Sequence, residues 1–168
     1  KYNIKYKLNK VKNNKKNPKT YTSAKKFVLK KPTRKGYAFK GWYTDRKCTK
    51  KITSIKKGSK KNYTVYAKWS KVKVKKTTGL KVTNTKGKNL VVKYFKVSGA
   101  KGYQITYATN SKFTKGKKVV NTTKRTKTIQ KLKKGKTYYV RVRAYKKDST
   151  GRKVYGKYST VKKIKITK

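Results

Sequence analysis

Carboxylate, imidazole and thiol groups, on which most catalytic sites depend, are almost absent from this sequence of 168 residues. The only carboxylates belong to Asp45 and Asp148, there is no histidine, and Cys48 is the single cysteine. A catalytic carboxylate pair would need both aspartates in one site, and Ser-His-Asp or Cys-His sites require a histidine. Zinc sites of His and several Cys, and calcium sites of several carboxylates, are excluded in the same way. The sequence therefore predicts a protein that is not an enzyme and holds no metal or cofactor.

The cysteine and the two aspartates have structural interpretations. One cysteine cannot form an internal disulfide. Cys48 lies beside Arg46 and Lys47, which would lower the pKa of an exposed thiol, but we interpret it as a small, partly buried apolar residue. Asp45 and Asp148 both lie in polar segments, and we expect both to be exposed. An internal Lys–Asn isopeptide crosslink, which uses a buried acid, is therefore not expected.

Cationic groups are the abundant functional groups. The 56 Lys and Arg residues give a formal net charge of +54, and only six of them are Arg. Cations at positions i and i+2 of a strand lie about 7 Å apart, on the scale of the charge spacing along a polyanion, which is about 3.4 Å per strand in DNA. Lys is a hydrated point charge, whereas Arg contacts guanine or phosphate with two hydrogen bonds. The excess of Lys, with no nucleic-acid-binding motif, therefore favours diffuse polyanion binding over sequence-specific recognition.

Strand alternation predicts which cations face solvent. Apolar and cationic residues alternate in 71–75, 140–143 and 163–166, so the apolar residues should face inward and the cations outward. The candidate polyanion-binding residues are Lys71, Lys73, Lys75, Arg141, Arg143, Lys163 and Lys165. The expected partners are anionic polymers (glycosaminoglycan, teichoic acid or nucleic acid bound without sequence preference) or acidic surfaces, with no small-molecule substrate. Self-repulsion favours a monomer. The alternative is that Lys is an ordinary solvated surface residue in this protein.

The rest of the composition predicts an all-β or mostly β protein. Hydrophobic residues make up 33% and aromatic residues 12% of the sequence, whereas disordered chains are poor in aromatics. Val, Ile, Thr and Tyr alternate with Lys, as in half-buried strands. No apolar run is long enough for a membrane span, and no signal-peptide core is present. Because the chain starts at Lys1 and contains no Met, we expect it to be a piece of a longer protein.

Two domains are predicted, 1–70 and 79–168, joined by the basic connector 71–78. The connector lacks Gly, Ser and Pro and has a pattern that a strand would also show. In the first domain, strand-like segments alternate with an Asn-rich loop, and 52–55 fits either a helical turn or a short strand. Its aromatic residues Tyr37, Phe39, Trp42 and Tyr43 are interpreted as core, the alternative being a surface that stacks on sugars or bases.

The second domain shows seven short strand-like segments separated by glycine-containing turns. They span residues 80–82, 90–95, 102–108, 117–120, 127–130, 137–145 and 161–166. This number and spacing of strands predict a β-sandwich.

Residues 1–70 resemble the Listeria–Bacteroides repeat, also called the InlB B-repeat. The matching motifs are Asn17-Pro18 with Tyr21, then Pro32-x-x-x-Gly36-Tyr37-x-Phe39-x-Gly41-Trp42-Tyr43-Thr44-Asp45, and Tyr66-Ala67-Lys68-Trp69. Lys10-Val11 replaces the Gly-Gly turn that members usually have. The resemblance implies a small β-grasp-like domain.

Residues 79–168 resemble a bacterial fibronectin type III domain. Leu132-x-x-Gly135-x-x-Tyr138 has the spacing of the tyrosine corner, in which the Tyr138 hydroxyl would bond to the backbone. Tyr94 occupies the position of the usual second-strand Trp. The resemblance implies a seven-stranded immunoglobulin-like sandwich, and the absence of an Arg-Gly-Asp tripeptide gives no support to integrin binding of that kind.

Both resemblances imply an extracellular protein on the surface of a Gram-positive bacterium. The leading hypothesis is non-catalytic adhesion through electrostatic binding of anionic polymers such as sulfated glycan, teichoic acid or extracellular nucleic acid. A second hypothesis is a structural spacer that presents another domain at the cell wall. A third is a scaffold that was deliberately supercharged.

Overall fold

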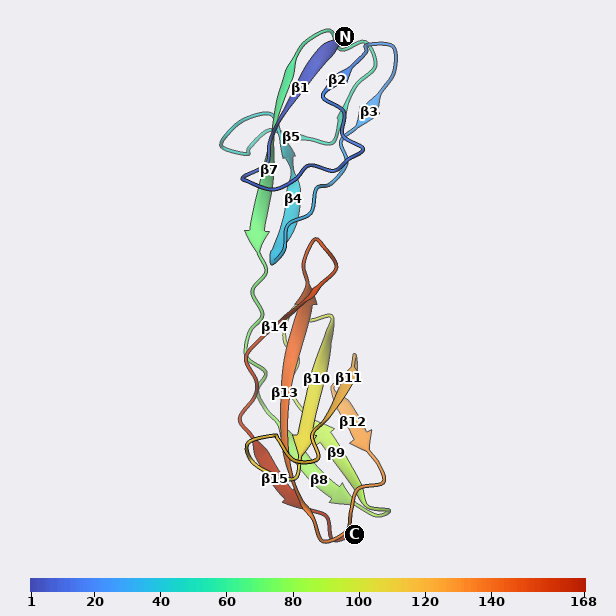
Figure 1. Ribbon diagram of the computed structural model, residues 1–168, viewed down its shortest axis with the longest axis vertical. Helices are drawn as coiled ribbons and strands as arrows, with labels where there is room; N and C mark the ends of the chain where they lie inside the picture. The colour runs from blue at the N-terminus through green and yellow to red at the C-terminus, as the bar shows by residue number, and fades with distance from the viewer. The chain divides into compact units, whose positions relative to one another are not determined.

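The computed structural model describes all 168 residues and contains strands but no helices (Figure 1). The prediction of an all-β protein is therefore confirmed. The chain divides into two compact units. The first contains Lys1–Val72 and Asp148–Arg152, and the second contains Lys73–Lys147 and Lys153–Lys168. No segment forms a helix with the length and apolar character needed to cross a membrane.

A mixed five-stranded sheet forms the first unit, in the order β2-β1-β7-β4-β5. Its central strands β1 (Tyr2–Lys7) and β7 (Tyr63–Lys71) are parallel, and the other pairs are antiparallel. The remaining strands are β2 (Thr20–Tyr21), β4 (Tyr37–Tyr43) and β5 (Lys51–Ile52). A separate pair consists of β3 (Phe27–Val28) and β6 (Ser54–Ile55). Residues 52–55 therefore belong to two short strands rather than a helical turn.

Aromatic residues fill much of the core of the first unit. Trp42 is buried, and its indole N–H donates a hydrogen bond to the Lys30 carbonyl. Phe39 packs edge-on against both Trp42 and Trp69, at ring-centroid distances of 5.4 and 5.3 Å. Tyr37 and Tyr43 are only half-buried. The interpretation of this cluster as core is correct for Trp42, whereas Phe39 is half-buried and packs against the core, and the two tyrosines are half-buried as well.

Asn17 shows why the Asn17-Pro18 motif occurs in the long loop after β1. Its side chain is buried and bonds to the backbone of Lys30 in both directions: the amide group donates to the Lys30 carbonyl, and the amide oxygen accepts from the Lys30 N–H, each at 2.8 Å. The same amide group donates to the side chain of Asn13. Asn17 thus takes the place of a strand partner in a segment that has no regular pairing.

The loop after β1 begins with two residues in the left-handed region. Asn9 has a φ of 54° and Lys10 a φ of 63°. Lys10 is one of the two residues that replace the family's usual Gly-Gly. The turn therefore keeps a conformation that favours glycine although no glycine is present.

The second unit is a sandwich of two antiparallel sheets. One has the order β12-β9-β8, and the other has the order β11-β10-β13-β14, with β15 also paired to β13. The first sheet consists of β8 (Lys81–Thr85), β9 (Asn89–Lys93) and β12 (Thr126–Ile129). The second consists of β10 (Gly102–Ala108), β11 (Lys118–Thr122), β13 (Thr137–Lys147), β14 (Lys153–Tyr155) and β15 (Lys162–Lys165).

The strands β14 and β15 pair with opposite ends of β13. Tyr155 lies opposite Tyr145, and Lys162 lies opposite Val140. Between these strands, the Ser159 N–H donates to the Val142 carbonyl, and the Ser159 hydroxyl accepts from the Val142 N–H. The two strands therefore form one interrupted edge strand, which completes the predicted seven-stranded sandwich. The strand option for the connector is wrong beyond Lys71, because 72–80 forms no strand.

Tyrosines occupy key positions in the core of the sandwich. The Tyr138 hydroxyl accepts a hydrogen bond from the Lys133 N–H at 3.1 Å, so the predicted tyrosine corner is present. Tyr94 is buried, 4.7 Å from the Tyr103 ring, and donates to the Lys124 carbonyl. Tyr94 therefore fills the core position at which the family usually has Trp.

Candidate functional site

The five candidate lysines have exposed side chains. Lys71 ends β7, and Lys73 and Lys75 follow in the extended connector. Lys163 and Lys165 lie on β15, where they alternate with the more buried Ile164 and Ile166. The alternation predicted for these segments is thus observed, and the ammonium groups are open to solvent.

The candidate arginines have a different environment. Arg141 and Arg143 lie on β13 and point away from the core, since Val140 and Val142, which alternate with them, are fully buried. Both arginines are nevertheless half-buried. Their positions on β13 lie beside the interruption between β14 and β15, and aromatic residues from other segments cover them there.

These aromatic residues form a ladder with the two guanidinium groups, made of Phe113, Arg141, Tyr158, Arg143 and Tyr155. The Arg141 guanidinium carbon lies 4.1 Å from the centre of the Phe113 ring and 4.0 Å from that of Tyr158. The Arg143 carbon lies 3.9 Å from the centre of the Tyr155 ring and 4.5 Å from that of Tyr158. At these distances each cation is attracted by two ring faces.

The two rungs of the ladder differ in their hydrogen bonds. Arg143 donates from Nε and Nη2 to the Gln104 side-chain oxygen, whereas Nε of Arg141 is buried without a partner. The sequence prediction included both arginines with the free lysines because it considered only the alternation on their own strand. The spacing of Tyr155 and Tyr158 was the available signal, but it becomes informative only once their place beside β13 is known.

The two carboxylates have separate sets of hydrogen-bond partners. Asp45 accepts hydrogen bonds from the Lys50 N–H and from the N–H and hydroxyl of Thr49, and the backbone bonds from Lys50 and Thr49 lower its pKa. No group of three or more His, Cys, Asp or Glu side chains is placed to hold a metal ion. Cys48 is half-buried, as interpreted from the sequence.

Asp148 is buried, and the expectation that it is exposed was wrong. Burial raises its pKa, but hydrogen bonds from the Gly36 N–H, from Thr150 and from the Arg152 N–H outweigh this effect and leave the pKa at about 2. The polar turn around Asp148 is thus folded around the carboxylate rather than open to water. Its hydrogen-bond partners are not a Lys–Asn pair, so the contacts give no support to an isopeptide crosslink.

Two family profiles match this chain. The Listeria-Bacteroides repeat domain (List_Bact_rpt) matches residues 2–68, and the fibronectin type III domain matches residues 70–157. No curated protein matches the chain.

Solved structures with similar folds share low sequence identity with this chain. The chicken CNTN1 FN1-FN3 domains are 20% identical with a TM-score of 0.49, over 68% of this chain and 41% of that chain. An Fn3-like protein from Clostridium thermocellum is 23% identical with a TM-score of 0.44, over 55% of this chain and 92% of that one. The FN5 domain of Drosophila Lar is 16% identical with a TM-score of 0.46, over 57% of this chain and 99% of that domain.

The type III profile covers more than half of the residues, and the sandwich with its tyrosine corner has the architecture of that family. The chain belongs to the fibronectin type III family, with a Listeria-Bacteroides repeat domain preceding its type III domain.

Proposed function

We propose that this chain is a non-catalytic surface-protein module that adheres to anionic polymers through its exposed lysines. The Listeria-Bacteroides repeat and the type III domain are typical of extracellular or cell-surface proteins. Type III domains are generally non-catalytic, and the two domain types fit a structural role. The formal net charge of +54 adds a property that a simple structural role does not require.

The observation that carries the proposal is that the positive charge is not neutralised within the chain. The two carboxylates are bonded to backbone N–H groups and to threonine hydroxyls. The lysines Lys71, Lys73, Lys75, Lys163 and Lys165 are all exposed. Ammonium groups in this setting attract a polyanion, and the counterions released from that polymer drive association.

The proposed partner is an anionic polymer recognised by its charge. Arg141 and Arg143 are covered by aromatic rings, so these two candidate residues are not free for bidentate base recognition. Sulfated glycan, teichoic acid and extracellular nucleic acid are all anionic polymers, so each of them can be attracted by the exposed ammonium groups. The protein is proposed to act as a monomer at the bacterial cell surface, because copies of such high charge repel one another.

A spacer is the second candidate function, and the two family matches favour it. In this case the domains hold another part of the protein away from the cell wall, and the lysines serve solubility. The two functions differ in whether the positions of the lysines matter.

Two variants that lose the same number of charges distinguish the adhesive function from the spacer function. One variant changes Lys71, Lys73, Lys75, Lys163 and Lys165 to Gln, and a control variant changes the exposed loop residues Lys15, Lys25, Lys57, Lys86 and Lys112. Adhesion through the strand and connector lysines predicts a loss of heparin affinity of about tenfold or more in the first variant and a smaller loss in the control. Equal losses in the two variants would favour the spacer, in which only total charge counts.

A further inference from the structure

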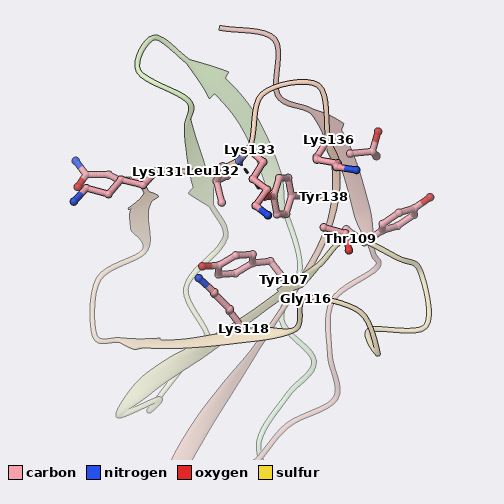
Figure 2. A pocket seen from close by; sticks show the side chains of 12 residues that line it. Tyr107, Thr109, Gly116, Lys118, Lys131, Leu132, Lys133, Lys136 and Tyr138 are labelled. Carbon is pink, nitrogen blue, oxygen red and sulfur yellow. Dashed lines mark hydrogen bonds between the residues drawn. The ribbon is translucent and has the colours of Figure 1, made fainter.

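A pocket of about 620 Å³ lies in the second unit, next to the tyrosine corner (Figure 2). It is lined by the end of β10, by the start of β11, and by the segment from Gln130 to Tyr139, which connects β12 to β13 and begins β13. Pockets of 300–1,000 Å³ are the usual size for small-molecule sites. All of the lining residues belong to the sandwich, so the site is formed within one unit.

Four lysines line the pocket: Lys118, Lys131, Lys133 and Lys136. All four are exposed, and no carboxylate is among the lining residues. Figure 2 shows the side chains of Lys118 and Lys133 extending toward the Tyr107 and Tyr138 rings, whereas Lys131 extends away from them. The pocket therefore offers several ammonium groups to an anionic ligand.

A tyrosine hydroxyl without a hydrogen-bond partner in the protein also lines this pocket. Tyr107 is 6% exposed, and no hydrogen bond is formed by its hydroxyl within the protein. The buried hydroxyls of Tyr94, Tyr103 and Tyr138 are each hydrogen-bonded to the backbone. The Tyr107 hydroxyl is not among the buried unpaired atoms, so it keeps access to the pocket and is available to hydrogen-bond a ligand there.

The Tyr107 hydroxyl remains a donor at neutral pH. Burial raises its pKa, and the neighbouring Tyr138 raises it further. The two rings lie 6.1 Å apart between centroids. Leu132 also lines the pocket and contributes apolar surface to it. Ammonium groups, a neutral hydroxyl donor and apolar surface therefore occur together.

We propose that this pocket binds an acidic sugar unit of an anionic glycan, with its sulfate or carboxylate at the lysines and a sugar hydroxyl at Tyr107. The proposal rests on the proposed function, because it selects one polymer and locates its point of contact. A nucleic acid base would need an exposed ring face for stacking, whereas Tyr107 and Tyr138 are buried and Tyr139, the third ring in the lining, is half-buried. A poly(phosphodiester) would bind the lysines through its phosphates but would make fewer contacts with the apolar part of the lining. The combination favours a sugar that carries a charge.

The most specific test is Tyr107→Phe, which removes only the unpartnered hydroxyl and leaves the net charge unchanged. We expect its affinity for a heparin-derived tetrasaccharide, measured by calorimetry at about 150 mM salt, to fall by roughly three- to tenfold, the loss of one hydrogen bond. Its affinity for teichoic acid and duplex DNA should stay within about twofold, the scatter of such measurements. A melting curve checks that the variant is folded.

A second pair of variants tests the lysines at equal charge. Lys118→Gln with Lys133→Gln removes two ammonium groups that point to the tyrosines, and Lys93→Gln with Lys127→Gln removes two exposed ones from the other sheet. We expect the pocket pair to reduce tetrasaccharide affinity at least fivefold more than the control pair, on the order of 1 kcal/mol.

The outcomes separate this proposal from the proposed function. Suppose that the wild-type protein binds heparin, that Tyr107→Phe has the wild-type tetrasaccharide affinity and that the pocket lysine pair has the affinity of its control pair. This result would contradict the pocket as the binding site and would still be consistent with polymer adhesion. Loss of teichoic acid or DNA binding in Tyr107→Phe equal to the loss of glycan binding would overturn the assignment of a sugar. Wild-type protein that binds none of the three polymers at this salt concentration would overturn both.

Discussion

Gln104 and Arg143 lie opposite each other on β10 and β13, and the Gln104 side-chain oxygen accepts two hydrogen bonds from the guanidinium, at 2.9 and 2.7 Å. Arg143 is at the same time stacked on Tyr155 and Tyr158. Its positive charge is therefore part of the internal structure of the sandwich. The exposed lysines are not held in this way, so the candidate cations divide into two arginines held within the sandwich and five exposed lysines.

This division predicts that Arg143→Lys destabilises the sandwich although it conserves charge. Lysine lacks the planar fork that bonds Gln104 and stacks between the rings. We expect the free energy of unfolding to fall by about 1–3 kcal/mol, measured by denaturant titration. Arg125→Lys is the control, because Arg125 is exposed, and it should change stability by less than about 0.5 kcal/mol. Equal effects at the two positions would show that the ladder does not stabilise the fold.

Salt should stabilise the folded protein. With 56 cations and two aspartates, charge repulsion opposes compaction, and ions screen this repulsion over a Debye length of about 8 Å at physiological salt. We expect the melting temperature to rise between about 10 mM and 150 mM salt. The rise should be smaller in the variant with five lysines changed to Gln. A flat or falling melting temperature would contradict the solvent-facing distribution of the lysines.

Stability should hardly depend on pH between neutrality and about pH 4. The chain has no histidine or glutamate, so only Asp45 and Asp148 gain protons at lower pH. The pKa of Asp148 is about 2 in the folded state against an ordinary value of 3.8, so the ionised carboxylate stabilises the fold above pH 4. This stabilisation is lost as the pH falls from about 4 through 2, and the lowered pKa of Asp45 acts in the same direction.

Asp148→Asn isolates the contribution of one carboxylate. The variant should be less stable than the wild-type protein at pH 7, and its stability should fall less between pH 4 and pH 2, as measured by thermal unfolding across this range. A wild-type protein that loses most of its stability between pH 7 and pH 5 would contradict this assignment, since no side chain titrates there.

Lys10→Gly should stabilise the first unit. Lys10 adopts a φ of 63°, a conformation that costs a non-glycine residue about 1–2 kcal/mol, and the greater flexibility of unfolded glycine offsets about 0.5–1 kcal/mol of the gain. We expect a net increase of up to about 1 kcal/mol in the free energy of unfolding. Lys10→Gln removes the same charge without relieving the backbone, so it should give a smaller increase. Equal effects in the two variants would assign the change to charge alone.

The sequence predicted the structure correctly where the residues of a single segment determine the local conformation. Alternation in residues 2–8 predicted β1, in which Ile4 is buried and Lys5 and Lys7 are exposed. The spacing from Leu132 to Tyr138 predicted the tyrosine corner because this motif is local. In both cases the strand period or a short-range hydrogen bond determines the structure, without reference to distant residues.

Features that depend on distant segments were not predictable in this way. Phe113 reaches Arg141 from a loop far away in the sequence, and nothing near β13 indicates that contact. The polar turn at Asp148 suggested exposure, whereas hydrogen bonds fold it around the carboxylate. β14 was missed because its three residues are too short for an alternation pattern. The pocket depends on the unpartnered hydroxyl of Tyr107, which has no signal in the sequence.

The most direct test of polymer adhesion is a binding titration of the unmodified protein against heparin, teichoic acid and duplex DNA, repeated from about 50 to 300 mM salt. All three affinities should fall with salt, with a slope near −0.9 per phosphate neutralised for DNA. The account predicts that heparin retains tight binding at physiological salt after the other two polymers are lost. If all three affinities collapse together, the charge is generic, and the chain is a spacer rather than an adhesive module.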